Sequence, residues 1–442
     1  MKFLIDEIIK ITGAKVLYST NLSGRFGIST DTRNISSEEI YIPIKGENFD
    51  GHDFIEDAIK KSVRGFFIEE AEAEKLKTLP RAKVELQVKN TREAYLALAG
   101  AYRQKVNPIV IAITGSSGKT TVKEIISAVL EKKHKVHKTK LNFNNEIGVA
   151  QTIFEMPKDT EILVLEMGMR GLGEIELLSR YAKPDIAIIT NIGLAHLGRL
   201  KTQENIAKAK YEVIKNLHPE GLLIVCQDDF TQKYAKVKNK IVYSLDYVKD
   251  IQKTFDGVSF KYKKADYKLN VSGDYNILNA ICAIEVGKKL GVMPKKIAEA
   301  FSEYKPLSNR GTILEIDGRT LITDYYNANP ESMKASISGV LETYGEVALV
   351  LGDMAELGEK EVFYHREIGR FLREKNVKNL VTVGTLAKNI AKVSGLKNTK
   401  SFDNTKDVAK YLQSFEKNVP ILLKASRAMK FEEIVEELKK GQ

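Results

Sequence analysis

The segment VIAITGSSGKTTVKEIISAVL (residues 110–130) joins an apolar, β-branched run to a helical pattern through a loop with two glycines. The run predicts a buried strand that ends at Ile113, and the helix begins at Lys119 or Thr120. Such a loop exposes backbone N–H groups to phosphate, while the lysine neutralises charge and a hydroxyl can bind Mg²⁺. We therefore expect a phosphate-binding loop formed by Gly115, Ser116, Ser117, Gly118, Lys119, Thr120 and Thr121.

The loop departs from the usual phosphate-loop pattern at one position. The glycine expected six residues before the lysine is replaced by Ile113. A simple glycine turn at a helix start is the alternative interpretation. That alternative does not explain why glycine, lysine and two hydroxyls occur together at the end of a strand, so nucleotide phosphate binding is the better hypothesis.

Apolar runs of the same kind recur along the chain, at 162–166, 186–190, 320–326, 347–353, 380–384 and 420–426. Strands that are apolar throughout are buried on both faces, which indicates parallel sheets flanked by helices. The predicted fold class is α/β with three domains: a small N-terminal α/β module, a central P-loop-type mostly parallel sheet, and a C-terminal Rossmann-like domain. We expect their boundaries at 1–90, 91–306 and 307–442, with a helix over 91–105 and a linker at 305–307.

The composition is that of a soluble enzyme-sized chain. The 442 residues carry 69 Lys and Arg against 58 Asp and Glu, a formal charge of +11. The lysines alternate with glutamates, as at 432–441, and no basic block with spaced aromatic residues occurs. We therefore interpret the excess charge as solvated surface and expect no nucleic-acid partner.

The cysteines and the first residues bear on the compartment. Cys226 and Cys282 are too few for a disulfide framework or a four-thiolate metal site, and they fit a reducing compartment. Asp6 and Glu7 lie where a signal peptide needs an apolar segment, and no apolar run approaches the ~18 residues of a membrane span. A cytoplasmic protein without a membrane span is expected.

Polar residues end or follow two of the other apolar runs. Glu166 ends one strand, while Asn191 and then His196 follow the next. Ligands of open parallel sheets bind at the carboxyl ends of the strands, so these side chains are expected near Lys119, where a carboxylate and an imidazole can hold a divalent metal. Each has a structural alternative when taken singly. Lys208 and Lys210 would both be solvated lysines from spacing alone.

Ten ordered motifs resemble those of the Mur ligases of peptidoglycan synthesis. They are TGSSGKTT (114–121), NNEIGV (144–149), LEMGMRGLGEI (165–175), TNIGLAHL (190–197), IAKAKYE (206–212), GDYNILNA (273–280), NRGTILE (309–315), ITDYYNANPESM (322–333), LGDMAELG (351–358) and KASR (424–427). The motifs at 324–333 and 352–358 are most similar to those of the members that add D-alanyl-D-alanine to UDP-N-acetylmuramoyl-tripeptide.

Two relatives are less similar. The members that add diaminopimelate would be expected to carry a DNPR-like motif, and NANP (327–330) stands here instead. Folylpolyglutamate synthetase shares the fold and the phosphate loop, but STDTR (29–33) and GENFDGHDF (46–54) are not expected in it.

The resemblance implies roles for individual residues around ATP and Mg²⁺. Lys119, Lys210, His196 and Arg310 would be catalytic, and the metal would be held directly or through water by Thr120, Glu166, His196 and Lys210. The lysine that matches Lys210 is carbamylated in the family, which requires a neutral amine to capture CO₂ and converts a cation into an anion. The nucleotide would further contact Asn145, Asn276, Asn279, Arg310 and Asp324.

The resemblance also implies two substrate sites. Asp31, Thr32, Arg33, Asp50 and the 46–52 stretch resemble the uridine-nucleotide pocket. The dipeptide would meet Asn327, Asn329, Lys424, Ser426 and Arg427, although Ala425 stands where the family has glycine. His365 could lie near this site, but a histidine on a helix face is more often structural, and that is the expectation here.

The implied reaction forms an amide bond through an acyl phosphate, with ATP as the phosphoryl donor, UDP-N-acetylmuramoyl-tripeptide and D-alanyl-D-alanine as substrates, and a monomeric enzyme. The alternatives are another Mur-type amino-acid ligase, a phosphate-loop switch without catalysis, or a basic nucleic-acid-binding chain. The sequence leaves open whether the tripeptide ends in lysine or diaminopimelate.

Overall fold

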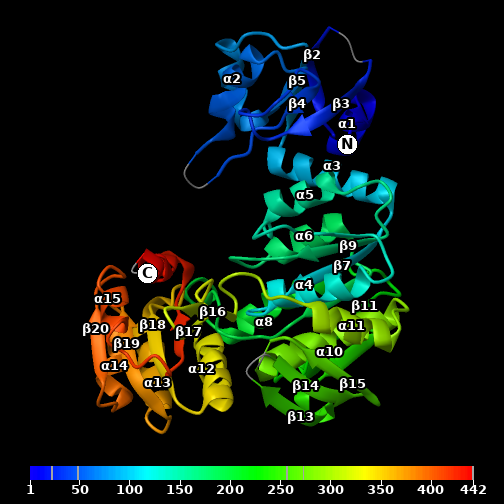
Figure 1. The fold of residues 1–442 in the computed structure, drawn as a ribbon. Coiled ribbons are helices and arrows are strands. Elements are labelled where there is room, and N and C mark those ends of the chain that lie inside the picture. Colours follow the sequence, from blue (N-terminus) through cyan, green and yellow to red (C-terminus); the bar gives the residue numbers. More distant parts are fainter. Residues whose placement is uncertain (21–22, 47–48, 255–256, 272, 441–442) are drawn as a thin grey trace. The chain divides into compact units, whose positions relative to one another are not determined.

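The computed structural model describes residues 1–20, 23–46, 49–254, 257–271 and 273–440 (Figure 1). The chain forms two compact units. Unit 1 comprises Met1–Ala112, Lys135–Met167 and Glu176–Pro184, and unit 2 comprises Ile113–His134, Gly168–Ile175 and Asp185–Gln442. Both are α/β structures with parallel strands, which confirms the predicted fold class.

The N-terminal part of unit 1 is a six-stranded sheet in the order β1-β3-β4-β5-β6-β2. The four inner strands are parallel, and the two edge strands are antiparallel to their neighbours. Tyr41, Ile55 and Phe66 form part of its buried core. The elements are β1 (Phe3–Leu4), α1 (Ile5–Thr12), β2 (Lys15–Ser19), β3 (Arg25–Ser29), β4 (Glu39–Tyr41), η1 (Gly51–Phe54), α2 (Ile55–Lys60), β5 (Gly65–Glu69), η2 (Glu70–Lys77) and β6 (Val84–Val88).

Unit 1 continues with the predicted helix, observed as α3 (Thr91–Val106), which begins at the side-chain cap of Asn90. It packs against α5 (Glu146–Glu155), where the rings of Tyr95 and Phe154 lie 5.0 Å apart and Arg92 pairs with Glu146 at 2.8 Å. The remaining elements are the parallel strands β8 (Val136–Lys138) and β9 (Ile162–Glu166), and α6 (Glu174–Ala182), whose first turn lies in unit 2.

Strand β7 (Ile109–Thr114) leads from unit 1 into unit 2 and extends one residue beyond its predicted end. In unit 2 the strands β10 (Ile186–Ile189), β11 (Leu222–Cys226) and β12 (Lys240–Tyr243) are parallel. The associated helices are α4 (Lys119–Leu130), α7 (Leu197–Leu200), α8 (Gln203–Tyr211), η3 (Glu212–Ile214), α9 (Thr231–Tyr234), η4 (Leu245–Tyr247), α10 (Asp274–Lys289) and α11 (Pro294–Glu303).

A three-stranded antiparallel sheet precedes α10 and was not predicted. It consists of β13 (Lys249–Thr254), β14 (Gly257–Tyr262) and β15 (Ala265–Leu269). Its inner side is apolar, with Phe260, Tyr267 and Phe301 of α11 in ring contact. The exposed, polar β13 carries no hydrophobic pattern from which a strand could be recognised.

The C-terminal part of unit 2 contains a six-stranded sheet in the order β16-β17-β21-β18-β19-β20. Helices α12, α13, α14 and α15 accompany its strands (Figure 1). All neighbours are parallel except the edge strand β16, and apolar cores cover both faces, as expected for the predicted Rossmann-like domain. The elements are β16 (Thr312–Ile316), β17 (Arg319–Thr323), α12 (Pro330–Tyr344), β18 (Val347–Gly352), η5 (Gly358–Lys360), α13 (Glu361–Leu372), β19 (Val377–Val383), α14 (Lys388–Ser394), β20 (Thr399–Phe402), α15 (Val408–Leu412), β21 (Ile421–Lys424), η6 (Arg427–Met429) and α16 (Glu432–Lys440).

Residues 305–307, the predicted linker, lie in the segment between α11 and β16. Within the described ranges, no helix combines the length and the apolar character that a membrane crossing requires.

Candidate active site

The predicted phosphate loop connects β7 to α4, and the helix begins at Lys119 as expected. Gly115 has φ +146°, and a Cβ on it would lie 1.9 Å from Thr190 Oγ1. Gly118 is left-handed at φ +78°. Both glycines are therefore required, the first by close approach and conformation and the second by conformation.

Replacing Gly115 with alanine should accordingly damage the loop. The added methyl group must displace Thr190, which itself donates a hydrogen bond of 2.6 Å to the carbonyl of Ser117. We expect a loss of about 1–3 kcal/mol in the free energy of unfolding and weaker nucleotide binding. Thermal unfolding and ATP titration check this, with Gly173→Ala as the control, because no atom lies within 4 Å of a Cβ there although its φ is also positive.

Asn191, which follows β10, forms hydrogen bonds with the backbone of the phosphate loop. The backbone N–H of Ser116 donates to Asn191 O at 3.0 Å, and that of Ser117 donates to Asn191 Oδ1 at 3.0 Å. The Asn191 amide in turn donates to Ser117 O at 3.1 Å, and Lys119 Nζ donates to Gly115 O at 2.7 Å. Asn191, noticed in the sequence only as a strand-end residue, thus holds the loop in shape.

The N-terminus of α10 approaches the same loop. Asn279 Oδ1 lies 3.2 Å from the position of a Cβ on Gly118, and Asn279 Nδ2 donates to Asn276 Oδ1 at 3.2 Å. Both asparagines are buried. The structure therefore brings these two predicted nucleotide residues to the phosphate loop.

The segment after β10 contacts the first turn of α12 and the loop after β18. His196 Nδ1 lies 2.6 Å from Glu356 Oε2, and the backbone N–H of Leu194 donates to Glu331 Oε2 at 3.2 Å. Contact with His196 lowers the pKa of the Glu356 carboxyl, and the charges of Arg199 and Lys119 act in the same direction against the effect of burial. Glu331 and Glu356 could not be recognised from the sequence beyond their place in the quoted motifs.

The two lysines of α8 differ sharply in exposure. Lys210 is 0% exposed, whereas Lys208 is exposed. Fully buried lysines are rare, so burial marks Lys210 as the unusual one. The adjacent Glu212 is also buried, and its carboxylate accepts the backbone N–H of Gly173 at 2.7 Å.

Glu166 lies in unit 1, at the end of β9, and is 2% exposed. Asn144 Nδ2 donates to its Oε1 at 2.8 Å, whereas the predicted Asn145 is exposed and caps α5 by accepting the N–H of Gly148. Spacing could not distinguish the two adjacent asparagines. Because Lys119, His196 and Lys210 belong to unit 2, the convergence of all four residues stays a prediction.

The side chain of Asp324, which follows β17, contacts two other side chains of the C-terminal part of unit 2. Lys424, 2% exposed, places Nζ 2.6 Å from Asp324 Oδ2, and Ser336 Oγ donates to the same oxygen at 2.5 Å. Nearby, the guanidinium of Arg310 lies 3.7 Å from the centre of the Tyr326 ring. Lys424 is thus committed to Asp324 in this arrangement, and Arg310 is stacked on an aromatic face.

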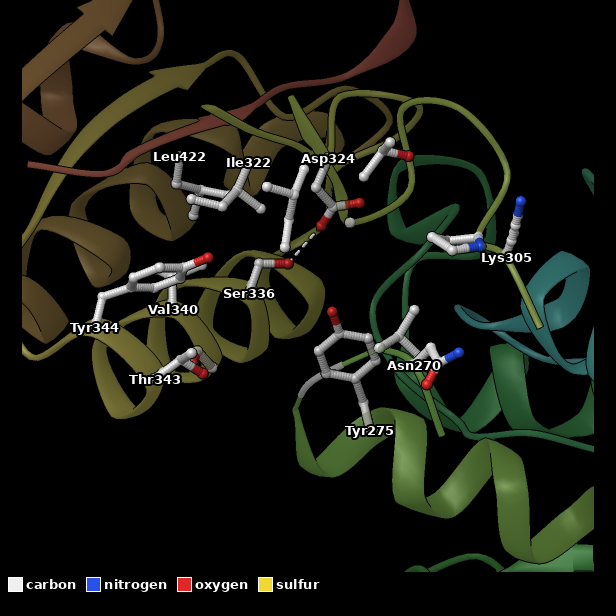
Figure 2. Close-up of a pocket in the computed structure, with 16 residues that line it drawn as sticks. Asn270, Tyr275, Lys305, Ile322, Asp324, Ser336, Val340, Thr343, Tyr344 and Leu422 are labelled. Carbon is white, nitrogen blue, oxygen red and sulfur yellow. Dashed lines mark hydrogen bonds between the residues drawn. The ribbon is translucent and has the colours of Figure 1, made fainter. Parts of the chain in front are cut away.

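A cavity of about 450 Å³ opens beside Asp324 (Figure 2). Apolar side chains of α12 and of the sheet form one wall, with Val340, Tyr344 and Leu422 among them, and Asn270 and Lys305 supply polar atoms. Tyr275, which precedes Asn276 at the start of α10, also lines it. A largely apolar pocket with a few polar groups suits a planar heterocycle attached to a sugar.

The other predicted dipeptide residues shape loops. Asn329 caps α12 by accepting the N–H of Ser332 at 2.8 Å, and Asn327 Oδ1 accepts that of Ala328 at 2.9 Å. Ser426 Oγ accepts the N–H of Ala355 at 2.8 Å. Arg427 is exposed and pairs with Glu432 at 3.1 Å.

Ala425 and His365 have local explanations. A Cβ on Gly352 would lie 2.6 Å from Ala425 Cβ, so the alanine fits because its neighbour lacks a side chain. His365 Nε2 accepts the N–H of Met354 at 2.9 Å, and Nδ1 contacts Glu361 O at 2.7 Å, so His365 supports the 352–358 loop. The expectation that His365 is structural is consistent with these bonds.

His365 makes stability depend on pH. Burial lowers the pKa of His365 below its ordinary value, so the unfolded chain takes up a proton first as pH falls. The stabilising effect is present above the unfolded pKa of ~6.5 and is lost as pH falls through the folded value. We expect the drop in Tm between pH 7.5 and pH 5 to be smaller in His365→Gln than in the wild type; exposed His218→Gln is the control, and an unchanged pH profile in His365→Gln would contradict this account.

The uridine candidates lie in unit 1. Asp31 accepts forked hydrogen bonds from Arg33 at 2.9 Å each, which lower the pKa of Asp31 to about 2. Burial opposes ionisation of Asp50, but bonds from His52, with Nδ1 at 2.6 Å, outweigh it and lower the pKa of Asp50 to about 2. Residues 47–48 of the predicted 46–52 stretch lie outside the described residues.

These polar turns occur at one edge of the N-terminal sheet. Asp31 and Thr32 follow the end of β3, and His52 Nε2 accepts the N–H of Glu69 at the end of β5. Because β3, β4 and β5 are parallel neighbours, their carboxyl ends share that edge. Asp31, Thr32, Arg33 and Asp50 are thereby placed at a position where ligands commonly bind.

Taken together, the glycine loop between a parallel strand and a helix N-terminus, the buried lysine of α8 and the appended C-terminal α/β sheet define a P-loop nucleotide-binding enzyme of several domains. Three family models match this chain: the Mur ligase family catalytic domain over residues 26–103, the Mur ligase middle domain over 113–287, and the Mur ligase glutamate ligase domain over 309–427. The chain belongs to the Mur ligase family.

Individual relatives are similar over the whole length. The UDP-N-acetylmuramoyl-tripeptide–D-alanyl-D-alanine ligase of Bacillus subtilis (strain 168) is 39% identical, covering 98% of this chain and 97% of its own. A crystal structure of MurF from Acinetobacter baumannii superposes with a TM-score of 0.91 at 28% identity, and the match covers 100% of this chain and 99% of that chain. The crystal structure of MurF ligase from Thermotoga maritima in complex with ADP superposes with a TM-score of 0.85 at 28% identity. The match covers 94% of this chain and 97% of that chain.

Proposed function

We propose that this chain is an ATP-dependent ligase that joins D-alanyl-D-alanine to the C-terminal carboxylate of UDP-N-acetylmuramoyl-tripeptide, giving the pentapeptide precursor of peptidoglycan. The observation that carries the proposal is the 39% identity to a ligase of this specificity over 98% of the chain. The glycine loop with Lys119, built as a nucleotide site requires, supports it independently.

The chemistry explains why ATP is needed. A carboxylate resists attack by an amine, because its negative charge and resonance oppose the nucleophile and oxide is a poor leaving group. Transfer of the γ-phosphoryl group of ATP to the carboxylate oxygen gives ADP and an acyl phosphate. The dipeptide amine then attacks the carbonyl carbon and loses a proton, and inorganic phosphate leaves from the tetrahedral intermediate.

The nucleotide would lie between the phosphate loop and the C-terminal sheet of unit 2. Lys119 and Arg310 would neutralise charge on the migrating phosphoryl group, and Asn145 would lie beside the phosphates. Asn276 and Asn279 would contact the adenine. The cavity beside Asp324 is the candidate binding site for the nucleoside (Figure 2). Both asparagines are buried, Asn279 lies beside Gly118 and donates to Asn276, and these contacts support the assignment.

Mg²⁺ fits the donor types that are present. Among the described residues, no three His, Cys, Asp or Glu side chains are grouped to hold a metal alone. Mg²⁺ is commonly bound through one or two protein oxygens with phosphates and waters, which Thr120, Glu166 and a carbamate on Lys210 would supply, while His196 would hold a metal-bound water. When bound, the ion neutralises phosphate charge and aligns the transferring group.

We propose separate tasks for the three parts of the chain. Residues 1–90 would bind the uridine nucleotide through Asp31, Thr32, Arg33 and Asp50. Residues 91–306 would hold ATP, and residues 307–442 would present the amine with the help of Asn327, Asn329, Lys424, Ser426 and Arg427. Residues 305–307 would serve as the hinge for a closure that keeps water from the acyl phosphate.

The direct assay is phosphate release from ATP and Mg²⁺ with UDP-N-acetylmuramoyl-tripeptide. We expect release that depends on D-alanyl-D-alanine and yields the pentapeptide. Substitution of free glutamate or diaminopimelate, with the correspondingly shorter acceptor, should give no product. Absence of dipeptide-dependent release, or turnover with a single amino acid instead, would contradict the proposal.

A further inference from the structure

The segment that carries His196 has three contacts with helix α12 and with the loop between β18 and η5. The backbone N–H of Leu194 donates to Glu331 Oε2 at 3.2 Å, and that of Gly198 donates to Glu356 O at 2.8 Å. His196 Nδ1 lies 2.6 Å from Glu356 Oε2. Glu356 therefore contacts both the imidazole and the backbone two residues further along the loop.

Both partners adopt left-handed backbone conformations, which are uncommon for residues other than glycine. His196 has φ +64° and Glu356 has φ +65°, in the left-handed region that glycine and asparagine tolerate better. Beside them, Gly198 and Gly358 pack so closely that a Cβ on Gly358 would lie 2.7 Å from Gly198 Cα. Left-handed non-glycine residues that meet across two loops suggest that the contact itself is required.

The value of the contact is orientation rather than stability. The side chains of His196 and Glu356 are 19% and 51% exposed, and pairs exposed to that extent contribute only ~0–1 kcal/mol. The imidazole N–H is not aligned with the carboxylate oxygen, although the two atoms are at hydrogen-bond distance. A carboxylate at Nδ1 nevertheless favours the tautomer with its proton there, which leaves Nε2 as the electron-pair donor.

We infer that Glu356 is a positioning residue for His196, which turns the imidazole toward the divalent cation or its water when the 352–358 loop docks on the loop after β10. The inference rests on the proposed function for the role of His196 and adds the residue that orients it. It also makes the orientation of His196 depend on docking of the 352–358 loop, because the carboxylate comes from that loop.

A double-mutant cycle tests this. Mn²⁺ affinity is measured by electron paramagnetic resonance with a non-hydrolysable ATP analogue in the wild type, Glu356→Gln, His196→Asn and the double variant. Asparagine is chosen because it tolerates the left-handed conformation. We expect each single variant to weaken Mn²⁺ binding about 10-fold, the effect usual for partners of metal-site histidines, and the double variant to weaken it no further.

The matched control is Glu359→Gln, which changes an exposed glutamate in η5, three residues after Glu356, and should bind Mn²⁺ as the wild type does. Thermal unfolding establishes that each variant is folded. In ligation assays, Glu356→Gln should lower kcat and leave the KM for the uridine nucleotide unchanged.

Three results would overturn the inference: unchanged Mn²⁺ affinity in Glu356→Gln, additive losses in the double variant, or an equal loss in Glu359→Gln. If the Mn²⁺ cycle is non-additive while the wild type shows no dipeptide-dependent turnover, the positioning role stands and the proposed function fails. If turnover is normal but the losses add, the proposed function stands and the positioning role fails.

Discussion

Lys210→Ala is expected to lower the rate of ligation on the order of 10³-fold while the protein stays folded. Lys210 is completely buried on α8, and the proposed carbamate would convert it into an oxygen ligand for a divalent cation. Loss of a ligand that fixes such a cation removes several kcal/mol of transition-state stabilisation, about 4 kcal/mol for that factor. Initial rates of dipeptide-dependent phosphate release measure the effect.

The control is Lys208→Ala, which removes the exposed lysine two residues earlier on the same helix and should leave the rate unchanged. Added short carboxylates should partly restore the activity of Lys210→Ala, because they can occupy the space of the lost carbamate. Depleting CO₂ should slow the wild type. Full activity in Lys210→Ala, or an equal loss in Lys208→Ala, would refute the carbamate.

The second large effect is expected from Lys119→Ala. The Lys119 ammonium donates to Gly115 O, so it lies over the loop where the phosphates are proposed to bind. Removing a cation that stabilises developing charge should lower kcat about 10²–10³-fold. Steady-state kinetics with varied ATP separate this loss from weaker ground-state binding, which would appear in KM alone.

Lys119→Arg separates charge from geometry. Arginine retains the positive charge but cannot place a compact ammonium over the loop carbonyl, so we expect only partial recovery. Lys208→Ala is again the control. A rate within a factor of two of the wild type in Lys119→Ala would remove the loop from the mechanism.

The sequence predicted the parts of the fold that have a strong local signal. The apolar runs that became β9, β10, β18 and β21 form strands that are buried along their whole length, and β7 is buried after Ile109. Helix α4 begins at Lys119 as expected. The need for glycines in the phosphate loop could be recognised from their spacing, because the strand before the loop and the helix after it each have a characteristic hydrophobic pattern.

Other features depend on tertiary contacts and leave no such mark. Neither the burial of Lys210 nor the exposure of Lys208 follows from their spacing on one helix. Asn144 and Asn145 are adjacent, and only the structure assigns the Glu166 contact to the first. Glu356 meets His196 from a loop 160 positions away in sequence, which periodicity cannot reveal.

The central claim is that ATP activates the tripeptide carboxylate as an acyl phosphate, and an isotope transfer tests it most directly. The substrate is UDP-N-acetylmuramoyl-tripeptide with ¹⁸O in its C-terminal carboxylate, incubated with ATP, Mg²⁺ and D-alanyl-D-alanine. Mass spectrometry of the released phosphate should find one ¹⁸O atom for each amide bond formed. Phosphate without ¹⁸O, alongside pentapeptide product, would contradict the account.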